Sequence, residues 1–264
     1  MTDLDDARAD RDSAMPLMGH LVELRTRILR SLVAVGLGAV IGWVVYHPVR
    51  RFLMEPLVQM ADKSEGQIRA DFISLAPLEQ FMLRIKMSTY IGLVLAMPVV
   101  LWQIWQFVAP GLYRNERRYA GAFIGSSILL FVLGAAIAYW TLPAALDFLT
   151  AVGGKEVTYQ YTAENYLMLI IYMMVAFGLG FEFPVLLVML QLVGVLEPQQ
   201  LARFRRFAIV GNAIIAAVIT PSADPISMSA LLVPMCILYE VAILIGRLVV
   251  RRRRRSDEAE RAAG

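Results

Sequence analysis

The chain has 264 residues, of which 58% are hydrophobic and 18% are charged, and its mean hydropathy is +0.61. Because so few polar groups cannot shield that much hydrocarbon from water, the composition excludes an ordinary soluble domain. It indicates a membrane protein. The formal net charge is +3, and the basic clusters alternate with hydrophobic spans, a pattern that argues against a continuous nucleic-acid-binding face.

Residues 1–15 are acidic and polar, and they lack the basic start and the cleavage site of a secretory signal peptide. We expect a disordered cytoplasmic tail here. From Pro16 the pattern becomes helical, because apolar residues recur at spacings of four, three and four: Leu17, Leu21, Leu24 and Ile28.

Six hydrophobic stretches follow, and we predict an all-α integral membrane protein with six transmembrane helices. The predicted spans are residues 31–46, 87–109, 120–142, 166–190, 207–220 and 226–246. The fifth has 14 residues, or about 21 Å of helix against a hydrocarbon core of about 30 Å. We expect this short helix to thin the bilayer beside it. The sixth contains Pro234 and Glu240, which predict a bend or a partly shielded helix.

Two long connections separate these spans on one side. Residues 48–79 are predicted to form a polar loop whose apolar side chains pack on the membrane surface. Residues 143–165 are predicted to form a second loop, with a turn at Gly153 and Gly154.

The distribution of positive charge predicts the orientation. Eighteen of the 25 lysines and arginines fall before the first span, in residues 110–119 and 191–206, and after residue 246. By the positive-inside rule these segments and both termini are cytoplasmic. We therefore predict a membrane domain at residues 16–246 and a basic, then polar, cytoplasmic tail at residues 247–264, whose arginine run 251–255 contacts anionic lipid.

Metal ligands and cofactor motifs are scarce. The chain has one cysteine, Cys236, and two histidines, too few for a zinc site of ordinary ligand count. Neither GxxxxGK[ST] nor GxGxxG occurs, so we predict no cofactor and no nucleotide hydrolysis. His20 and His47 fall on opposite sides of the first span, which disfavours a membrane serine protease. We predict that the protein is not an enzyme.

Polar residues inside the predicted spans are candidate functional groups. Glu182 lies well inside the fourth span, where a carboxylate costs a few kcal/mol on insertion scales, so we expect it to face protein or water. A helix-packing hydrogen bond is the alternative role, but because intramembrane acids are usually functional we favour a functional role by about two to one. Gln103 and Asn212 are weaker candidates of the same kind.

Glu23 and Glu116 both lie beside arginines on the predicted cytoplasmic side. From the residues alone, the favoured interpretation is that they form ordinary interfacial ion pairs with those arginines, each contributing about 0–1 kcal/mol if exposed.

Four segments together resemble the TatC family, the polytopic subunit of the twin-arginine (Sec-independent) protein translocase. They are residues 20–27 (HLVELRTR), residues 102–118 (WQIWQFVAPGLYRNERR), residues 181–184 (FEFP), and Thr220 and Pro221 with Asp224. The first two signatures are specific in combination, and the resemblance extends from about residue 16 to residue 246.

The resemblance implies a receptor for signal peptides with two adjacent arginines, which exports folded proteins across a bacterial or archaeal cytoplasmic membrane using the proton-motive force. Implied partners are single-span subunits of the TatA and TatB type, in a multimeric complex. The resemblance assigns signal-peptide binding to Glu23, Glu116, Arg25 and Leu24; intramembrane partner contact to Glu182 and Gln103; and a periplasmic cap to Pro56, Phe81 and Asp224. A carboxylate accepts the planar donor fork of arginine bidentately, and lysine cannot reproduce this.

Two other functions stay open. A proton-coupled small-molecule transporter would use Glu182 as its proton site, but it predicts inverted repeats, and the two halves of this chain differ in span length and loop content. A structural scaffold would leave export intact when both cytoplasmic acids are removed.

Overall fold

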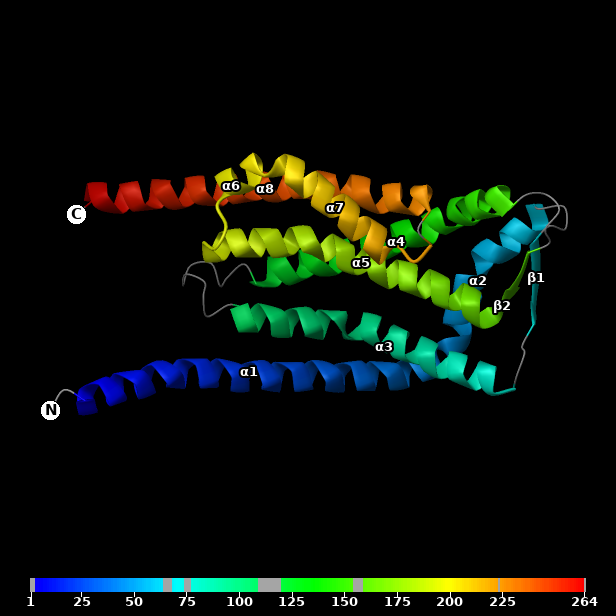
Figure 1. Ribbon diagram of the computed structural model, residues 1–264, viewed down its shortest axis with the longest axis horizontal. Helices are drawn as coiled ribbons and strands as arrows, with labels where there is room; N and C mark the ends of the chain where they lie inside the picture. Colours follow the sequence, from blue (N-terminus) through cyan, green and yellow to red (C-terminus); the bar gives the residue numbers. More distant parts are fainter. Residues whose placement is uncertain are drawn as a thin grey trace.

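The computed structural model describes residues 3–63, 68–73, 77–108, 120–153, 159–222 and 224–263. These residues form eight helices and two short strands, arranged as a long helical bundle (Figure 1). The elements are α1 (Asp3–Val44), α2 (Tyr46–Lys63), β1 (Ile68–Ile73), α3 (Pro77–Val108), α4 (Ala120–Gly153), β2 (Tyr159–Thr162), α5 (Ala163–Val193), α6 (Pro198–Arg203), α7 (Arg205–Ile219) and α8 (Pro225–Ala263).

Five described helices are long and apolar enough to cross a membrane. Their apolar segments are Leu21–Val44, Leu78–Phe107, Phe123–Val152, Ala163–Leu192 and Pro225–Val249. These match the first four and the last of the predicted spans, although the first begins ten residues earlier than predicted. α7 corresponds to the fifth predicted span and has only 15 residues, or about 22 Å of helix. The short fifth helix is therefore confirmed.

The bundle has the start of α1 and the end of α8 at the same end, and α2, β1 and β2 at the other (Figure 1). α3 lies beside α1, and α5 lies between α4 and α8 with contacts to both. This arrangement separates two candidate regions, one at the end that holds the start of α1 and one along α5.

The loop prediction for residues 48–79 is wrong in part, because α2 and β1 occupy much of it. Pro48 is the third residue of α2, and the first helical turn needs no amide donor there. Leu53, Leu57 and Met60 recur at helical spacing and are buried. α2 is therefore a core element of the bundle.

The second loop prediction also needs correction. α4 continues through Pro143 to Gly153, and β2 then pairs in parallel with β1, with Ile68 opposite Tyr159. Parallel strands are joined by a long connection, so no hairpin turn between β1 and β2 marks either strand in the sequence. The fold is all-helical apart from this two-stranded ribbon.

The predicted tail boundaries do not coincide with helix ends. α1 includes residues 3–15, for which the composition predicted disorder, and α8 continues past residue 246 to Ala263. The sequence of residues 3–15 supports a helix, because alanine and arginine are strong helix formers and aspartates near a helix N-terminus interact favourably with its dipole.

Small residues allow α1 and α3 to approach closely. A Cβ atom added at Gly92 of α3 would lie 2.3 Å from the backbone nitrogen of Ala39, and one added at Gly38 would lie 2.6 Å from the carbonyl oxygen of Gly92. Gly42, one turn beyond Gly38, lies against the backbone of Ser88 in the same way. Such small-residue contacts let helices associate in lipid through van der Waals packing.

Substitution of Gly92 by alanine should therefore destabilise the bundle by about 1–3 kcal/mol, because backbone cannot move aside as a flexible side chain can. Thermal unfolding in detergent measures the effect. Gly121→Ala is the matched control, because nothing lies within 4 Å of a Cβ atom added there. Equal melting temperatures for the two variants would contradict the close packing of α1 on α3.

Candidate functional site

Arg27, near the middle of α1, joins this helix to the last turns of α3, on the side of the bundle that carries both termini. Its Nε donates to Oε1 of Glu23 at 3.1 Å, and its Nη2 forms an ion pair with the same oxygen. Its Nη1 donates to Oε1 of Gln106 at 2.7 Å. The Arg27 side chain is only 16% exposed, against 35% for Glu23. These three interactions hold the Arg27 guanidinium in a partly buried position.

Glu23 keeps an unused acceptor in this arrangement. The hydrogen bonds that the described residues make to its carboxylate end on Oε1, so Oε2 has no partner among those residues. The expected interfacial ion pair therefore exists, with Arg27 as the partner. It orients the carboxylate without occupying it fully.

Gln103 belongs to this cluster. Its Oε1 accepts a long hydrogen bond of 3.5 Å from Nη1 of Arg27, and its side chain is buried. The sequence grouped it with Glu182, whereas the structure brings it to Glu23. Sequence reasoning named Arg27 among the candidate ion-pair partners but gave no role to Gln106, although the three-residue spacing of Gln103 and Gln106 predicts that both face the same neighbour.

The other predicted signal-peptide residues divide into two groups. Leu24 is half-buried and Arg25 is exposed, on the turn of α1 that carries Glu23. Glu116 falls in residues 109–119, outside the described residues.

Glu182 lies within the apolar segment of α5 and is half-buried. Its Oε1 is buried and has no hydrogen-bond partner among the described residues, and the same is true of the Oγ atom of Ser127 on α4. A polar atom that is buried without a partner costs free energy comparable to a lost hydrogen bond. The Ser127 hydroxyl interacts with the Glu182 carboxylate without a hydrogen bond of ordinary geometry, so the described residues satisfy this carboxylate incompletely.

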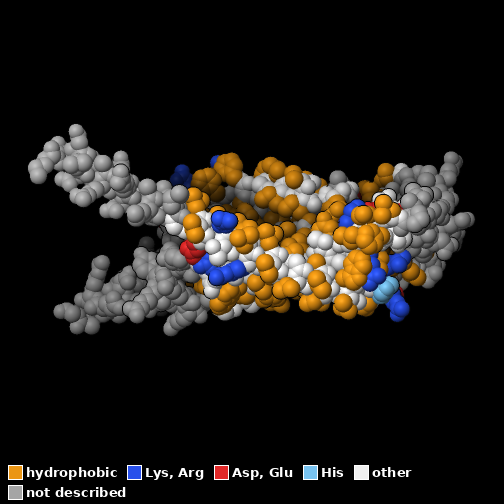
Figure 2. Space-filling model, turned by 90° about the horizontal axis from the view of Figure 1, so that it is seen from below, with side chains coloured by type: hydrophobic (Ala, Val, Ile, Leu, Met, Phe, Trp, Pro, Cys, Tyr) orange, Lys and Arg blue, Asp and Glu red, His pale blue; other side chains and the backbone are white. Residues whose placement is uncertain are grey.

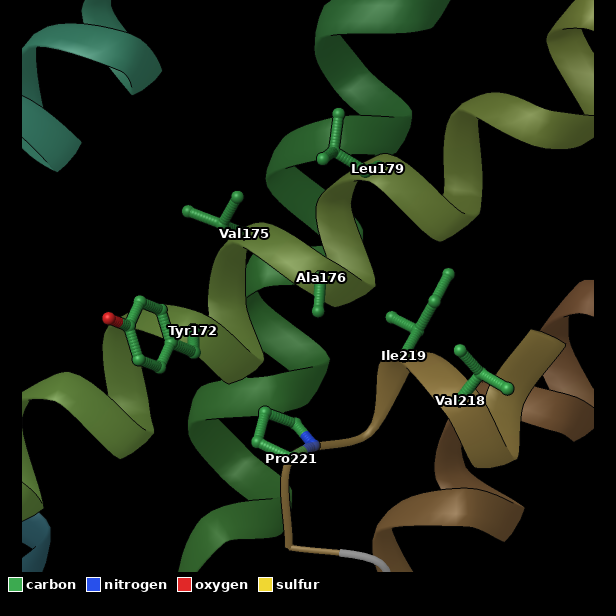
Figure 3. Close-up of a pocket in the computed structure, with 7 residues that line it drawn as sticks. All are labelled: Tyr172, Val175, Ala176, Leu179, Val218, Ile219 and Pro221. Carbon is green, nitrogen blue, oxygen red and sulfur yellow. The ribbon is translucent and has the colours of Figure 1, made fainter.

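An apolar groove of about 470 Å³ lies between α5 and the end of α7. Figure 3 shows Tyr172, Val175, Ala176 and Leu179 projecting from α5, with Val218, Ile219 and Pro221 opposite them. α7 ends at Ile219, where the chain turns towards α8. Leu179 precedes Glu182 by three residues, so the groove ends one helical turn from that carboxylate.

The three predicted cap residues lie on three different elements. Pro56 is buried within α2, and Phe81 is exposed near the start of α3 with its ring edge against Trp43. Asp224 is buried and caps the N-terminus of α8, since its Oδ1 accepts the Ser227 backbone N–H at 2.7 Å.

Hydrogen bonds determine the ionisation of Asp224. Burial alone would raise the pKa of this carboxyl, but bonds from the Ser222 hydroxyl and the Ser227 backbone N–H favour its charged form. The net result is a pKa below the ordinary value. The geometry therefore gives Asp224 a helix-capping role.

The model of one protein family matches residues 19–234, and its description is Sec-independent protein translocase protein (TatC). A protein of that name from Xylanimonas cellulosilytica is 40% identical over 232 residues, which cover 87% of this chain and 82% of that protein. One from Aquifex aeolicus is 37% identical over 248 residues, which cover 93% of this chain and 100% of that protein. A chloroplastic protein of Arabidopsis thaliana is 38% identical over 229 residues, covering 86% of this chain and 65% of that protein.

A solved structure has the same architecture. The crystal structure of a twin arginine translocase receptor, TatC, is 36% identical and superposes with a TM-score of 0.69, covering 88% of this chain and 99% of that one. Because 36% of the aligned residues are identical, the two chains are similar in sequence as well as in fold.

The capping role of Asp224 predicts a pH dependence. Because its pKa is lower in the folded state than the unfolded value of about 4, its charge stabilises the fold above that pH, and the contribution is lost as the pH falls through the folded pKa. The melting temperature of the wild type should therefore fall towards that of Asp224→Asn between about pH 5 and pH 2. Asp147→Asn, at an exposed site on α4, is the control. A difference between wild type and Asp224→Asn that is independent of pH would contradict this role.

Proposed function

The chain belongs to the TatC family, and on that premise we propose that it is the signal-peptide receptor and core subunit of a twin-arginine protein translocase. Members of this family are Sec-independent protein translocase proteins. In this role the chain binds the twin-arginine signal peptides of folded precursor proteins at the end of the bundle where α1 begins.

One observation carries the proposal: the half-exposed Glu23 carboxylate is fixed by Arg27 through Oε1, and within the described part of the chain its Oε2 accepts no hydrogen bond. A guanidinium offers paired donors in a rigid plane, so a carboxylate that is already oriented loses little entropy on accepting it. Lysine has the same charge but no planar fork.

The arginines near Glu23 add selectivity. Arg27 neutralises part of the carboxylate charge, and exposed Arg25 lies two residues away. A lone cation gains little from such a site. We propose that Glu116 supplies the second carboxylate, so that two adjacent arginines bind together.

The proposed orientation places both termini in the cytoplasm. The start of α1 and the end of α8 share one end of the bundle (Figure 1). That end also carries most of the basic residues, which supports a cytoplasmic position for it. Six spans result if the short α7 counts as one, in the cytoplasmic membrane of a bacterium or archaeon.

Single-span subunits of the TatA and TatB type are the proposed partners along α5, in a multimeric complex. A helix that lies in the groove would bring polar side chains within reach of the unpartnered Glu182 oxygen. The proton-motive force is the proposed energy source, since the sequence has no nucleotide-binding motif. A proton-coupled small-molecule transporter is less well supported, because the groove is lined almost wholly by apolar side chains.

Substitution of Glu23 by glutamine should reduce crosslinking of a twin-arginine precursor about ten- to hundredfold, which corresponds to the loss of one charged hydrogen-bond pair. Glutamine retains an acceptor for Arg27, so the contact between α1 and α3 should survive. Photocrosslinking in membrane vesicles measures the loss.

Glu55→Gln is the matched control, since Glu55 is exposed on α2 at the opposite end of the bundle. Its crosslinking should equal that of the wild type. Unchanged crosslinking in Glu23→Gln, and in the double variant with Glu116→Gln, would overturn the proposal.

Lengthening α7 by four residues, about one turn or 5.4 Å, should impair transport of a folded reporter while precursor crosslinking persists. A longer α7 would fill the space where the groove now ends and remove the local mismatch with the bilayer. The same four residues appended after Ala263 serve as the control. Full transport by the lengthened variant would count against a role for the short helix.

A further inference from the structure

Three arginines at the end of the bundle away from the termini have no acidic partner among the described residues. The described ion pairs join Arg27 to Glu23, Lys86 to Glu164 and Arg205 to Glu240. Arg50, Arg51 and Arg84 belong to none of them. The nearest acid along α2, Glu55, instead accepts a hydrogen bond from Gln59 at 3.0 Å.

Arg84 is held against two aromatic rings. Its guanidinium carbon lies 4.2 Å from the centre of the Trp43 ring and 5.3 Å from that of Tyr46. Its Nη2 donates to the carbonyl oxygen of Trp43 at 3.2 Å, in the last turn of α1. Its Nε is buried and donates to no partner in the part of the chain that the structure describes. The rings fix this cation in place and leave part of its donor fork unused.

α2 presents further positive charge beside Arg84. His47, Arg50 and Arg51 are spaced by three and four residues, so they share one face of the first turns of α2. The His47 ring lies 5.2 Å from that of Tyr46, and Nε of Arg50 is buried without a partner. Figure 2 shows lysine or arginine side chains around the histidine at this end. We call Arg50, Arg51 and Arg84 the distal cationic patch, beside which His47 lies.

The patch lies at the expected depth of lipid headgroups. The apolar segment of α1 ends at Val44, directly before the patch, and Trp43 and Tyr46 are residues typical of the membrane interface. Below the patch, α1 exposes a continuous apolar strip made of Leu37, Val40, Ile41 and Val44. A ligand with an anionic head and hydrocarbon chains would match both surfaces.

We propose that the distal cationic patch binds the phosphodiester headgroup of an anionic phospholipid, whose acyl chains lie along the exposed strip of α1. Phosphate oxygens accept hydrogen bonds from arginine forks bidentately. The terminal guanidinium nitrogens of the patch would donate these bonds, since among the described residues their one hydrogen bond runs from Nη2 of Arg84 to the carbonyl oxygen of Trp43. The apolar strip favours a lipid over free phosphate. The inference requires only that the bundle spans a membrane, and it does not depend on signal-peptide recognition.

Fluorescence quenching of Trp43 tests the site directly. The chain has four tryptophans, and Trp102→Phe, Trp105→Phe and Trp140→Phe leave Trp43 alone. The protein is reconstituted in phosphatidylcholine vesicles that contain brominated phosphatidylglycerol or brominated phosphatidylcholine. We expect stronger quenching by phosphatidylglycerol, and Arg50→Gln with Arg51→Gln should reduce the preference about fivefold for each arginine. Arg203→Gln with Arg206→Gln, at exposed sites near the other end, should leave it unchanged.

Equal quenching by the two lipids would overturn the proposal, as would relief of quenching by inorganic phosphate, which would indicate a free-anion site. Trp105 is buried, so the single-tryptophan chain could fail to fold. Native mass spectrometry of the otherwise unaltered protein, with and without the two α2 substitutions, then counts retained phosphatidylglycerol. Equal retention would overturn the proposal. Precursor crosslinking at the Glu23 end should be normal in these variants, which separates this test from that of the proposed function.

Discussion

Arg27 is the residue on which the arrangement of the proposed recognition site depends. Its guanidinium bonds to Glu23 within α1 and to Gln103 and Gln106 on α3, so one side chain positions two helices and one carboxylate. Arginine suits this position because a single planar group supplies five donors in fixed directions. The close packing of glycines between α1 and α3 makes such a short connection possible. Recognition and helix packing thus share the same contacts.

Three other polar residues in or beside the apolar bundle differ in whether their hydrogen bonds are satisfied: Asp224, Gln191 and Glu182. Asp224 is satisfied by the start of α8, and Gln191 donates to the carbonyl oxygen of Ala242 to join α5 to α8. Oε1 of Glu182 has no hydrogen-bond partner among the described residues, and Glu182 lies one turn from the groove beside the end of α7. In lipid such an unsatisfied oxygen favours association with another helix. The proposed peptide site at Glu23 and the proposed partner site at Glu182 therefore lie on different helices, α1 and α5.

Hydropathy predicted the main helices because a span needs a long apolar run, and the 15-residue α7 was predicted as short for the same reason. α2 was missed because Pro48 and Pro56 were interpreted as loop signals, although one lies in the first turn and the other is buried in the helix. The Arg27 cluster joins residues 76 and 79 positions apart, a pairing that no local pattern encodes. The family motifs include Arg27, Gln103 and Gln106, but they did not indicate that these side chains meet beside Glu23.

Relative affinity for paired arginines and paired lysines tests the central claim most directly. Synthetic signal peptides carrying either pair are titrated against the wild type and Glu23→Gln in detergent. If the Glu23 carboxylate accepts a guanidinium fork, the wild type prefers the arginine peptide and the variant loses about tenfold or more of that preference. An arginine preference that is the same in both proteins would contradict the account.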